Sequence, residues 1–157
     1  MRVYRIYRKQ RRDAAFTGQG ARMSGARWNF PGTPIVYACS TISLCLLEFF
    51  VHFDPTAVDI GKLDLEYRWA EIPETVPHLE VREDDLPSDW KEIPWTHSTQ
   101  ELGTKWMIQA KYLVVAVPSV VVPTERTFLL NPAHPAFSKI HLGPPSAMDM
   151  DPRLFSR

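Results

Sequence analysis

The sequence predicts an α+β fold with a largely antiparallel sheet, and three observations lead to this prediction. Short β-favouring runs cluster in the second half of the chain, one apolar run has the length of a helix, and helices and strands do not alternate regularly. The chain has 157 residues, of which 45% are hydrophobic and 23% charged, as in a globular protein with one core. We therefore expect residues 1–157 to form a single domain.

The first third of the chain predicts two strands, a long loop and a helix. Residues 3–7 alternate β-favouring and basic side chains, which is typical of a half-buried strand. Residues 16–32 are rich in glycine and other small residues and predict a long functional loop or an irregular pair of short strands. Residues 35–39 predict a buried strand, and Ser40 is the expected N-cap of a helix over residues 41–53.

The rest of the chain predicts mainly short strands. Residues 58–67 predict a strand with a bulge near Gly61. Residues 71–94 contain eight acidic and two basic side chains and four prolines, so we expect a solvated excursion with little regular structure. A capping box at residues 98–101 predicts a helix that ends near Ala110. Short β-rich runs follow at residues 112–117, 120–122, 126–130 and 137–142.

The composition excludes several classes of protein. Cys39 and Cys45 are too few for a disulfide scaffold and too widely spaced for a CxxC motif, which indicates core thiols in a reducing compartment. The basic N-terminus lacks the apolar run of a signal peptide. Residues 35–53 are apolar, but Glu48 and His52 interrupt them, whereas a membrane-spanning helix needs about 20 predominantly apolar residues. We expect a soluble, cytoplasmic protein that makes no membrane contact.

Glu48 is the most informative single residue of the predicted helix. The helix is apolar nearly all round, which is typical of a buried helix. Because successive residues are about 100° apart, Thr41, Glu48 and His52 share one narrow stripe, with Cys45 close to it. A carboxylate in such surroundings needs a partner. It is either a structural pair with His52 or with an arginine of the glycine-rich segment, or a catalytic carboxylate at the floor of a cleft.

Arg27 is the second candidate, because small residues precede it and an aromatic residue follows it in residues 25–30. Small residues let a ligand approach the backbone, and a guanidinium can bind phosphate or pyrophosphate with two parallel hydrogen bonds. The alternative is an ordinary surface arginine. Gly18-Gln19-Gly20 resembles part of a phosphate-binding loop, but no helix is expected directly after it, which excludes a Rossmann dinucleotide site.

Ser119 lies between two predicted strands, in Val117-Pro118-Ser119. It lacks the GxSxG motif of a nucleophilic serine, and its simplest interpretation is a serine that caps a turn. The five histidines have no metal-ligand spacing such as HExxH, so we expect no metal site.

Taken together, these residues resemble the RES domain, the toxin component of bacterial RES–Xre toxin–antitoxin pairs. The family name refers to an arginine, a glutamate and a serine, which correspond here to Arg27, Glu48 and Ser119. One departure is Ala26, where the family often has a second glycine. The resemblance covers most of the chain, since further segments match in the family's order: Tyr4-Arg5, residues 18–21, Arg27-Trp28-Asn29, Val36-Tyr37, Leu47-Glu48, Leu86-Pro87, Leu102-Gly103 with Trp106, Val117-Pro118-Ser119, and Asn131-Pro132 with His134.

The resemblance implies an ADP-ribosyltransferase-like fold, in which a split, mainly antiparallel sheet surrounds an NAD cleft and helices flank it. Arg5 and Arg27 would bind the pyrophosphate and the nicotinamide ribose, and Tyr37 would stack on nicotinamide. Glu48 would orient the ribose hydroxyl, and Ser119 would support the site. The implied catalytic residues are Arg27, Glu48 and Ser119, and the implied NAD-binding residues are Arg5, Arg27, Tyr37 and Asn131.

The expected function is therefore that of a type II toxin–antitoxin toxin, which depletes NAD by cleaving the nicotinamide–ribose bond as a glycohydrolase or phosphorylase. Some relatives instead transfer ADP-ribose to a protein, so a mono-ADP-ribosyltransferase is the first alternative. The resemblance also implies an Xre-like antitoxin that covers the NAD cleft and a toxin homodimer within a larger complex. NAD is the implied substrate, and no metal is required.

The charge distribution supports a second alternative of a different class. The chain has 18 basic and 18 acidic residues, yet residues 1–28 contain eight basic side chains and a single acid. Such a segment can bind nucleic acid through phosphate neutralisation, with Arg8, Lys9, Arg11 and Arg12 as its centre. However, the segment has neither repeated aromatic residues nor a recognition helix, so we expect no direct contact with nucleic acid.

Overall fold

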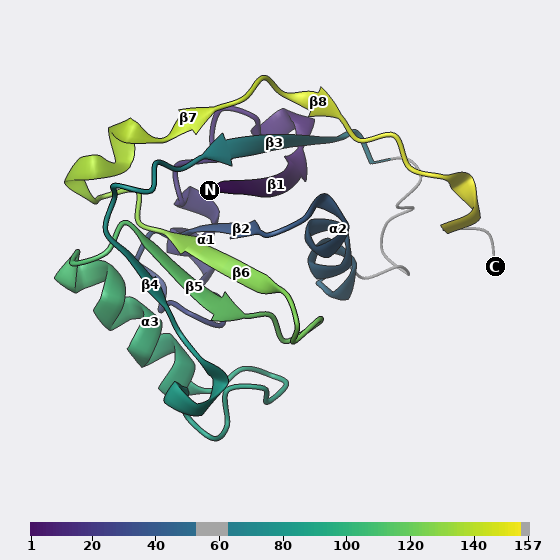
Figure 1. Ribbon diagram of the computed structural model, residues 1–157. Helices are drawn as coiled ribbons and strands as arrows, with labels where there is room; N and C mark the ends of the chain where they lie inside the picture. The colour runs from purple at the N-terminus through teal and green to yellow at the C-terminus, as the bar shows by residue number, and fades with distance from the viewer. Residues whose placement is uncertain (53–62, 155–157) are drawn as a thin grey trace.

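A single curved sheet organises the computed structural model, which describes residues 1–52 and 63–154 (Figure 1). In these residues, eight strands are arranged in the order β4-β5-β6-β2-β1-β3-β7, and β8 pairs with β3. The described strand pairs are antiparallel except for β4 and β5, which confirms the predicted class. The strands are β1 (Arg2–Arg8), β2 (Val36–Cys39), β3 (Leu65–Glu71), β4 (His78–Glu80), β5 (Val114–Pro118), β6 (Arg126–Leu130), β7 (His141–Leu142) and β8 (Ser146–Ala147).

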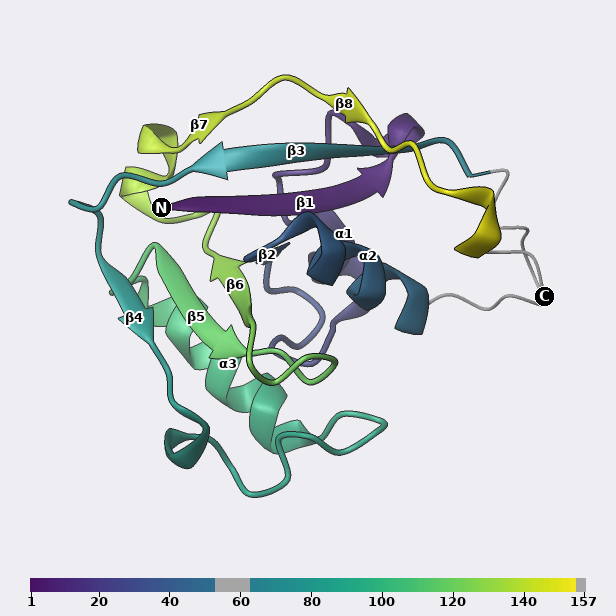
Figure 2. The same cartoon turned by 45° about the vertical axis from the view of Figure 1, so that its right-hand side comes forward.

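Helices flank this sheet at different places. In Figures 1 and 2, α3 runs beside β4, β5 and β6, whereas α2 lies at the end of β2. Among the described helices, none is both long and apolar enough to cross a membrane. The α-helices are α1 (Gln19–Ser24), α2 (Ile42–Val51) and α3 (His97–Gln109), and single 3-10 turns occur at Lys9–Arg11, Glu83–Asp85, Pro135–Lys139 and Pro152–Leu154.

The sheet is split between β1 and β2. These two strands pair at one position, Tyr4 with Cys39. By contrast, β1 pairs with β3 from Arg2 to Arg8, and β2 pairs with β6 along its whole length. Strand β1 therefore stays with β3 and strand β2 stays with β6, so the two halves of the sheet separate beyond Tyr4. This division agrees with the split sheet that the resemblance implied.

Each face of the sheet has its own hydrophobic core, because successive side chains of a strand point to opposite faces. One core contains Val3, Val36, Ala38, Val114, Ala116, Phe128 and Leu130 together with Ala15 and Phe16. The other contains Val115, Val117, Leu129, Trp28 and Met107, and the helix α3 covers it. A third, smaller cluster contains Cys39, Leu44 and Cys45, packed against Tyr4 and Ile6 of β1.

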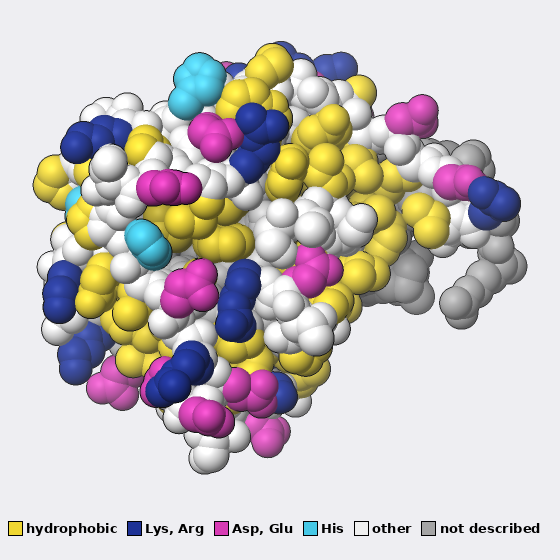
Figure 3. All heavy atoms as spheres, in the orientation of Figure 1, with side chains coloured by type: hydrophobic (Ala, Val, Ile, Leu, Met, Phe, Trp, Pro, Cys, Tyr) yellow, Lys and Arg dark blue, Asp and Glu magenta, His cyan; other side chains and the backbone are white. Residues whose placement is uncertain are grey.

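The predicted helix at residues 41–53 exists as α2, but two details were wrong. Its N-cap is Thr41, whose hydroxyl accepts a hydrogen bond from the Leu44 amide at 3.0 Å, and not Ser40. The helix is also not buried, since Leu47 and Val51 are 43% and 60% exposed. Apolar side chains accordingly reach the surface over α2 (Figure 3). An apolar composition predicts that a helix packs against other elements, but it does not show how much of the helix those elements bury.

Residues 16–32 do not form the predicted loop or short strands throughout. Helix α1 begins directly after Gly18, which has a positive φ of 71°. A Cβ at this position would lie 2.9 Å from the Ile35 amide nitrogen, so both the backbone and the packing require glycine. The expectation that no helix follows residues 18–20 was therefore wrong. The Rossmann fold remains excluded, because β2 pairs antiparallel with both neighbours.

Residues 71–94 are more ordered than predicted. Strand β4 extends the sheet parallel to β5, and Val81 and Trp90 are almost fully buried. The acidic residues do not prevent this, because Glu80, Glu83 and their neighbours point to solvent while the interspersed apolar side chains anchor the segment. The average composition of the segment predicted little regular structure, because it does not reveal the few buried side chains, such as Val81 and Trp90, that anchor the segment to the core.

Several smaller predictions also differ from the structure. Helix α3 begins at His97 with Thr96 as its N-cap, and Ser98 donates to Asp89 at 2.6 Å instead of capping. Residues 120–122 form a turn and not a strand, and residues 137–142 contain a 3-10 turn before the short β7. The predicted strand at 58–67 overlaps β3, while its proposed bulge near Gly61 lies outside the described residues.

Candidate active site

Arg5 bridges the split in the sheet. Its Nη1 donates a hydrogen bond to the Tyr37 carbonyl on β2. Its Nε atom is buried and has no hydrogen-bond partner within the described part of the chain. Burial lowers the pKa of this guanidinium, while the nearby thiols of Cys45 and Cys39 oppose the shift. A buried cation with an unused donor, placed at the split, is suited to an anionic ligand.

The loop that contains Arg27 is fixed from inside by Asn29, which is fully buried. Asn29 Nδ2 donates to the Ala21 carbonyl at 2.8 Å and to the Thr33 carbonyl at 3.0 Å. Its Oδ1 accepts a 2.8 Å hydrogen bond from the Tyr37 hydroxyl, which itself accepts from the Trp28 amide at 3.2 Å. Burial raises the pKa of Tyr37, so its phenol stays protonated. The loop is thus tied to β2.

Helix α3 holds the same loop from the other side. Gln100 Nε2 lies 3.2 Å from the Ala26 and Asn29 carbonyls, and Thr104 Oγ1 accepts from the Phe30 amide at 3.0 Å. Gly103 allows close contact, because a Cβ there would lie 2.1 Å from the Trp28 carbonyl oxygen. Neither contact was predicted from the sequence, since isolated polar residues on a helix, such as Gln100 and Thr104, carry no recognisable pattern.

Arg27 points from this loop toward the segment before α3. Its Nη1 donates to the Trp90 carbonyl at 2.6 Å and to the Glu92 carbonyl at 3.0 Å. Desolvation lowers the pKa of Arg27, while the opposite charge of Glu48 and the Tyr37 phenol oppose the shift. Arg27 therefore lies within electrostatic range of Glu48, and it is not an ordinary surface arginine.

Glu48 accepts hydrogen bonds from two hydroxyls, one directly after β5 and one on β6. Ser119 Oγ donates to Oε1 at 2.8 Å, and Thr127 Oγ1 donates to the same oxygen at 3.4 Å. Ser119 is 1% exposed, and its Oγ also accepts from the Val121 amide at 3.1 Å, so it caps a turn as well. The partner expected for Glu48 was His52 or an arginine, whereas the structure shows hydroxyls. No signal in the sequence pointed to Thr127.

The remaining predicted residues divide into two groups. Cys39 and Cys45 are free, buried thiols beside the site, and Cys45 together with burial raises the pKa of Cys39. Asn131 is not brought to Glu48, because it bonds to the Met107 carbonyl at 2.9 Å at the opposite end of β6. Four residues of strand separate it from Thr127, or about 13 Å. Among the described residues, no group of three possible metal ligands forms.

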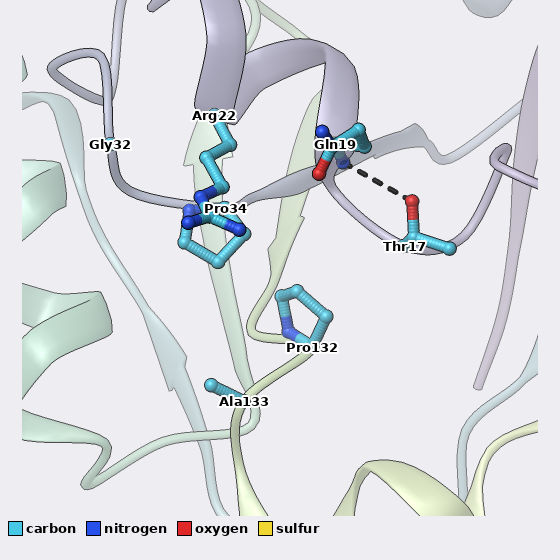
Figure 4. Close-up of a pocket in the computed structure, with 7 residues that line it drawn as sticks. All are labelled: Thr17, Gln19, Arg22, Gly32, Pro34, Pro132 and Ala133. Carbon is cyan, nitrogen blue, oxygen red and sulfur yellow. Dashed lines mark hydrogen bonds between the residues drawn. The ribbon is translucent and has the colours of Figure 1, made fainter.

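A separate cavity of about 270 Å³ lies outside this arrangement (Figure 4). The Gln19 amide donates to Thr17 Oγ1 at its edge, at 3.2 Å. None of the predicted site residues lines it, so the cavity is separate from the group around the split. Its lining residues are Thr17, Gln19, Arg22, Gly32, Pro34, Pro132 and Ala133.

The site therefore combines Arg5 and Arg27 with Glu48 around the split in the sheet. Two guanidinium groups can bind a doubly charged anion such as pyrophosphate. A carboxylate oriented by hydroxyls can stabilise positive charge that develops on a ligand. Glu48 Oε1 is occupied by Ser119 and Thr127, and in the described part of the chain no hydrogen bond reaches Oε2. Oε2 therefore keeps its capacity to accept a hydrogen bond.

The chain is similar in sequence to a known family and to named toxins. The RES domain family matches residues 2–151. "Toxin Res" of Yersinia enterocolitica is 34% identical over 155 residues, which are 98% of this chain and 99% of that protein. "Prs ADP-ribosylating toxin" of Sphingobium sp. is 33% identical over 143 residues, or 90% of this chain and 87% of that protein.

The chain is also similar in fold to a solved structure. A chain of the Mycobacterium tuberculosis MbcT–MbcA toxin–antitoxin complex aligns with a TM-score of 0.70 at 18% identity. The alignment covers 98% of this chain and 86% of that chain. It confirms the predicted fold, because the structural match extends over nearly the whole of this chain.

Proposed function

The chain belongs to the RES domain family, and we propose that it is a toxin that depletes NAD by cleaving the nicotinamide–ribose bond. The observation that carries the proposal is the contact between Ser119 and Glu48 at 2.8 Å, with Arg27 within electrostatic range. Relatives that match 98% and 88% of this chain bear the name "Toxin Res", which supports the same role.

The chemistry requires a carboxylate at the place where positive charge develops. When the bond between C1′ and the nicotinamide nitrogen breaks, nicotinamide leaves with the bonding electron pair and the ribose becomes oxocarbenium-like. Glu48 Oε2 would face this charge and orient the ribose hydroxyl, while Ser119 holds the other oxygen. In hydrolysis the oxygen of water then bonds to C1′ and its proton passes to the solvent, whereas in phosphorolysis an ionised phosphate oxygen bonds to C1′ and no proton is lost.

The arginines would bind the pyrophosphate without reacting. Arg27 uses Nη1 for the Trp90 and Glu92 carbonyls, so its other guanidinium donors would reach the ligand. Arg5 would contribute the buried Nε that has no partner within the described residues. The hydroxyl of Tyr37 is engaged by Asn29, which leaves only its ring to stack on nicotinamide.

A mono-ADP-ribosyltransferase is the second candidate, and one relative favours it directly. "Prs ADP-ribosylating toxin" is 33% identical over most of this chain. Both activities use the same bond cleavage and differ in the acceptor of ADP-ribose. Incubation with labelled NAD, with and without inorganic phosphate, distinguishes them. Free ADP-ribose indicates a glycohydrolase, ADP-ribose phosphate a phosphorylase and labelled protein a transferase, whereas unconsumed NAD contradicts the proposal.

The partner would be an Xre-like antitoxin in the cytoplasm, with the toxin as a homodimer in a larger complex. The mycobacterial chain of similar fold belongs to a toxin–antitoxin complex, and this supports a partner of that kind. Direct nucleic-acid binding by the basic segment is less favoured, because Lys9 pairs with Asp64 at 3.2 Å and Arg12 pairs with Glu66. These pairs neutralise half of the basic group Arg8, Lys9, Arg11 and Arg12.

A further inference from the structure

We propose that Glu125 is a positioning residue, which fixes the first turn of α2 and thereby holds Glu48 against Ser119. The inference rests on the proposed function, because it concerns the carboxylate assigned to the reaction. Glu125 itself does not touch the assigned ligand-binding atoms. Its effect on activity would pass through the placement of Glu48.

The contacts of Glu125 are concentrated on one oxygen. Oε2 accepts a hydrogen bond from Ser40 Oγ at 2.9 Å and another from Thr41 Oγ1 at 2.7 Å. Thr41 is the N-cap of α2, and its Oγ1 also accepts from the Leu44 amide. One carboxylate therefore joins the end of β2 to the start of the helix. Hydrogen bonds to an ionised acceptor are stronger than neutral ones.

The same turn between β5 and β6 also carries Ser119. The Ser119 amide donates to the Glu125 carbonyl at 3.1 Å, and the Ser119 hydroxyl donates to Glu48. Helix α2 is thus attached to this turn at two points, Thr41 and Glu48. Seven residues separate them, or about 10 Å along the helix. Two attachments at this spacing define the direction of the helix, whereas one attachment allows it to pivot.

The attachment matters because the packing of α2 against the sheet is concentrated at Leu44 and Cys45, where Cys45 Sγ also donates to the Tyr4 carbonyl at 3.0 Å. Of the described residues of the helix, only Leu44 and Cys45 are fully buried, whereas Leu47 and Val51 are 43% and 60% exposed and the other apolar side chains are half-buried. A helix with two buried side chains can tilt when one end is released. A displacement of about 1 Å at a reacting group can reduce the rate by about 100-fold. Loss of the Glu125 attachment should therefore change catalysis more than it changes binding.

The test compares Glu125→Ala with Glu125→Gln in NAD turnover. We expect Glu125→Ala to lower kcat by about tenfold and to change KM by less than about twofold, because Arg5 and Arg27 remain in place. Glu125→Gln keeps an oxygen that accepts both hydroxyls, so it should restore kcat to within about threefold. Ser40→Ala removes one of the two hydroxyl donors to Glu125 and leaves the Thr41 N-cap intact, so it should give a smaller fall in kcat. The same variant tests the attachment if Glu125→Ala does not fold.

The matched control is Glu66→Gln, which disrupts the Arg12 ion pair on β3, away from Glu48. It should lower the melting temperature while it preserves kcat, so a fall in kcat specific to Glu125 is not a general loss of stability. Hydrogen exchange of the α2 amides provides a readout without turnover, and Glu125→Ala should accelerate it relative to Glu66→Gln.

Failure of this inference differs from failure of the proposed function. If the wild type consumes NAD, Glu48→Gln is inactive and Glu125→Ala retains wild-type kcat, Glu125 has no positioning role. If the wild type does not consume NAD, the proposed function fails. If, in addition, the α2 amides exchange hydrogen at the same rate in Glu125→Ala and wild type, the attachment is overturned as well. Accelerated exchange in that case supports the attachment alone.

Discussion

The loop of Arg27 and the helix of Glu48 are held in opposite ways. The loop is fixed by a buried asparagine, two side chains of α3 and a glycine contact that permits no Cβ. The helix α2 has two buried side chains and hydroxyl–carboxylate contacts near its two ends. Arg27, the proposed pyrophosphate ligand, thus lies on a loop held by several contacts, whereas Glu48, the proposed catalytic carboxylate, lies on a helix with only two fully buried side chains among its described residues. Substitutions in the two regions should therefore have different signatures.

The largest effect is expected for Glu48→Gln on α2. The neutral amide cannot stabilise positive charge on the ribose, so NAD turnover should fall by about 100-fold or more. NAD binding, measured by calorimetry, should change little, because the arginines are unaltered. Leu47→Ala is the matched control, since Leu47 is a neighbouring, 43% exposed side chain of the same helix. Equal turnover of Glu48→Gln and wild type would show that the assigned mechanism is wrong.

Gly103→Ala tests the rigidity of the Arg27 loop. The added Cβ would lie 2.1 Å from the Trp28 carbonyl oxygen, so the loop and α3 must separate. We expect a loss of about 1–3 kcal/mol in the free energy of unfolding, measured by urea denaturation, and weaker NAD binding. Gly20→Ala is the control, because nothing lies within 4 Å of its added Cβ, and it should not destabilise α1. Similar destabilisation by both variants would contradict the close contact.

Tyr37→Phe separates the two roles of Tyr37. The ring remains for stacking, but Asn29 Oδ1 and the Trp28 amide lose their partner, which costs about 1–3 kcal/mol of stability. KM for NAD should rise severalfold through the displaced loop, while kcat stays near that of wild type. Tyr37→Leu is the comparison that also removes the ring. A kcat defect in Tyr37→Phe would place the hydroxyl in the reaction instead.

The smallest effect concerns Glu66, which lies in neither region and provides a baseline for stability. Its hydrogen bonds to Arg12 hold the pKa of Glu66 below its usual value. A lowered pKa in the folded state adds stability above the unfolded pKa of about 4.3, and this contribution is lost as the pH falls toward the folded value. Thermal melts between neutral and acidic pH should show a weaker pH dependence in Glu66→Gln than in wild type. The same pH dependence of the melting temperature in both proteins would show that Glu66 makes no such contribution to stability.

Much of the fold was predictable from local patterns. The strands β1, β2 and β6 and the helix α2 follow from alternation, β-branched runs and an apolar stretch, within a few residues of their ends. The helix α3 was also predicted, although from a capping box at residues 98–101 that the structure does not show. Arg27, Glu48 and Ser119 were grouped by resemblance to a family and not by periodicity. Asn131 was included on the same basis, although its hydrogen bonds attach β6 to the end of α3.

The residues that were missed share a physical property. Thr127, Gln100, Thr104 and Glu125 act through partners that lie 70 to 85 residues away in the sequence, as in the contacts of Gln100 with Ala26 and of Glu125 with Ser40. A single polar residue on a strand or helix shows no period and no motif. Such a residue acquires its role only when the folded sheet brings its distant partner within hydrogen-bond distance.

The sequence by itself determined the class of fold, most element types and the presence of a helix with one carboxylate among apolar residues. These features depend on residues within a few positions of one another, where backbone preference and side-chain period act directly. The tertiary structure decided that Glu48 meets Ser119 across 71 positions, and that α2 stays partly exposed. Strand pairing decided the first, because β6 pairs with both β2 and β5 and so brings the helix that follows β2 close to the residue that follows β5. The packing of α2 against the sheet decided the second, because it fully buries only Leu44 and Cys45 of the described helix.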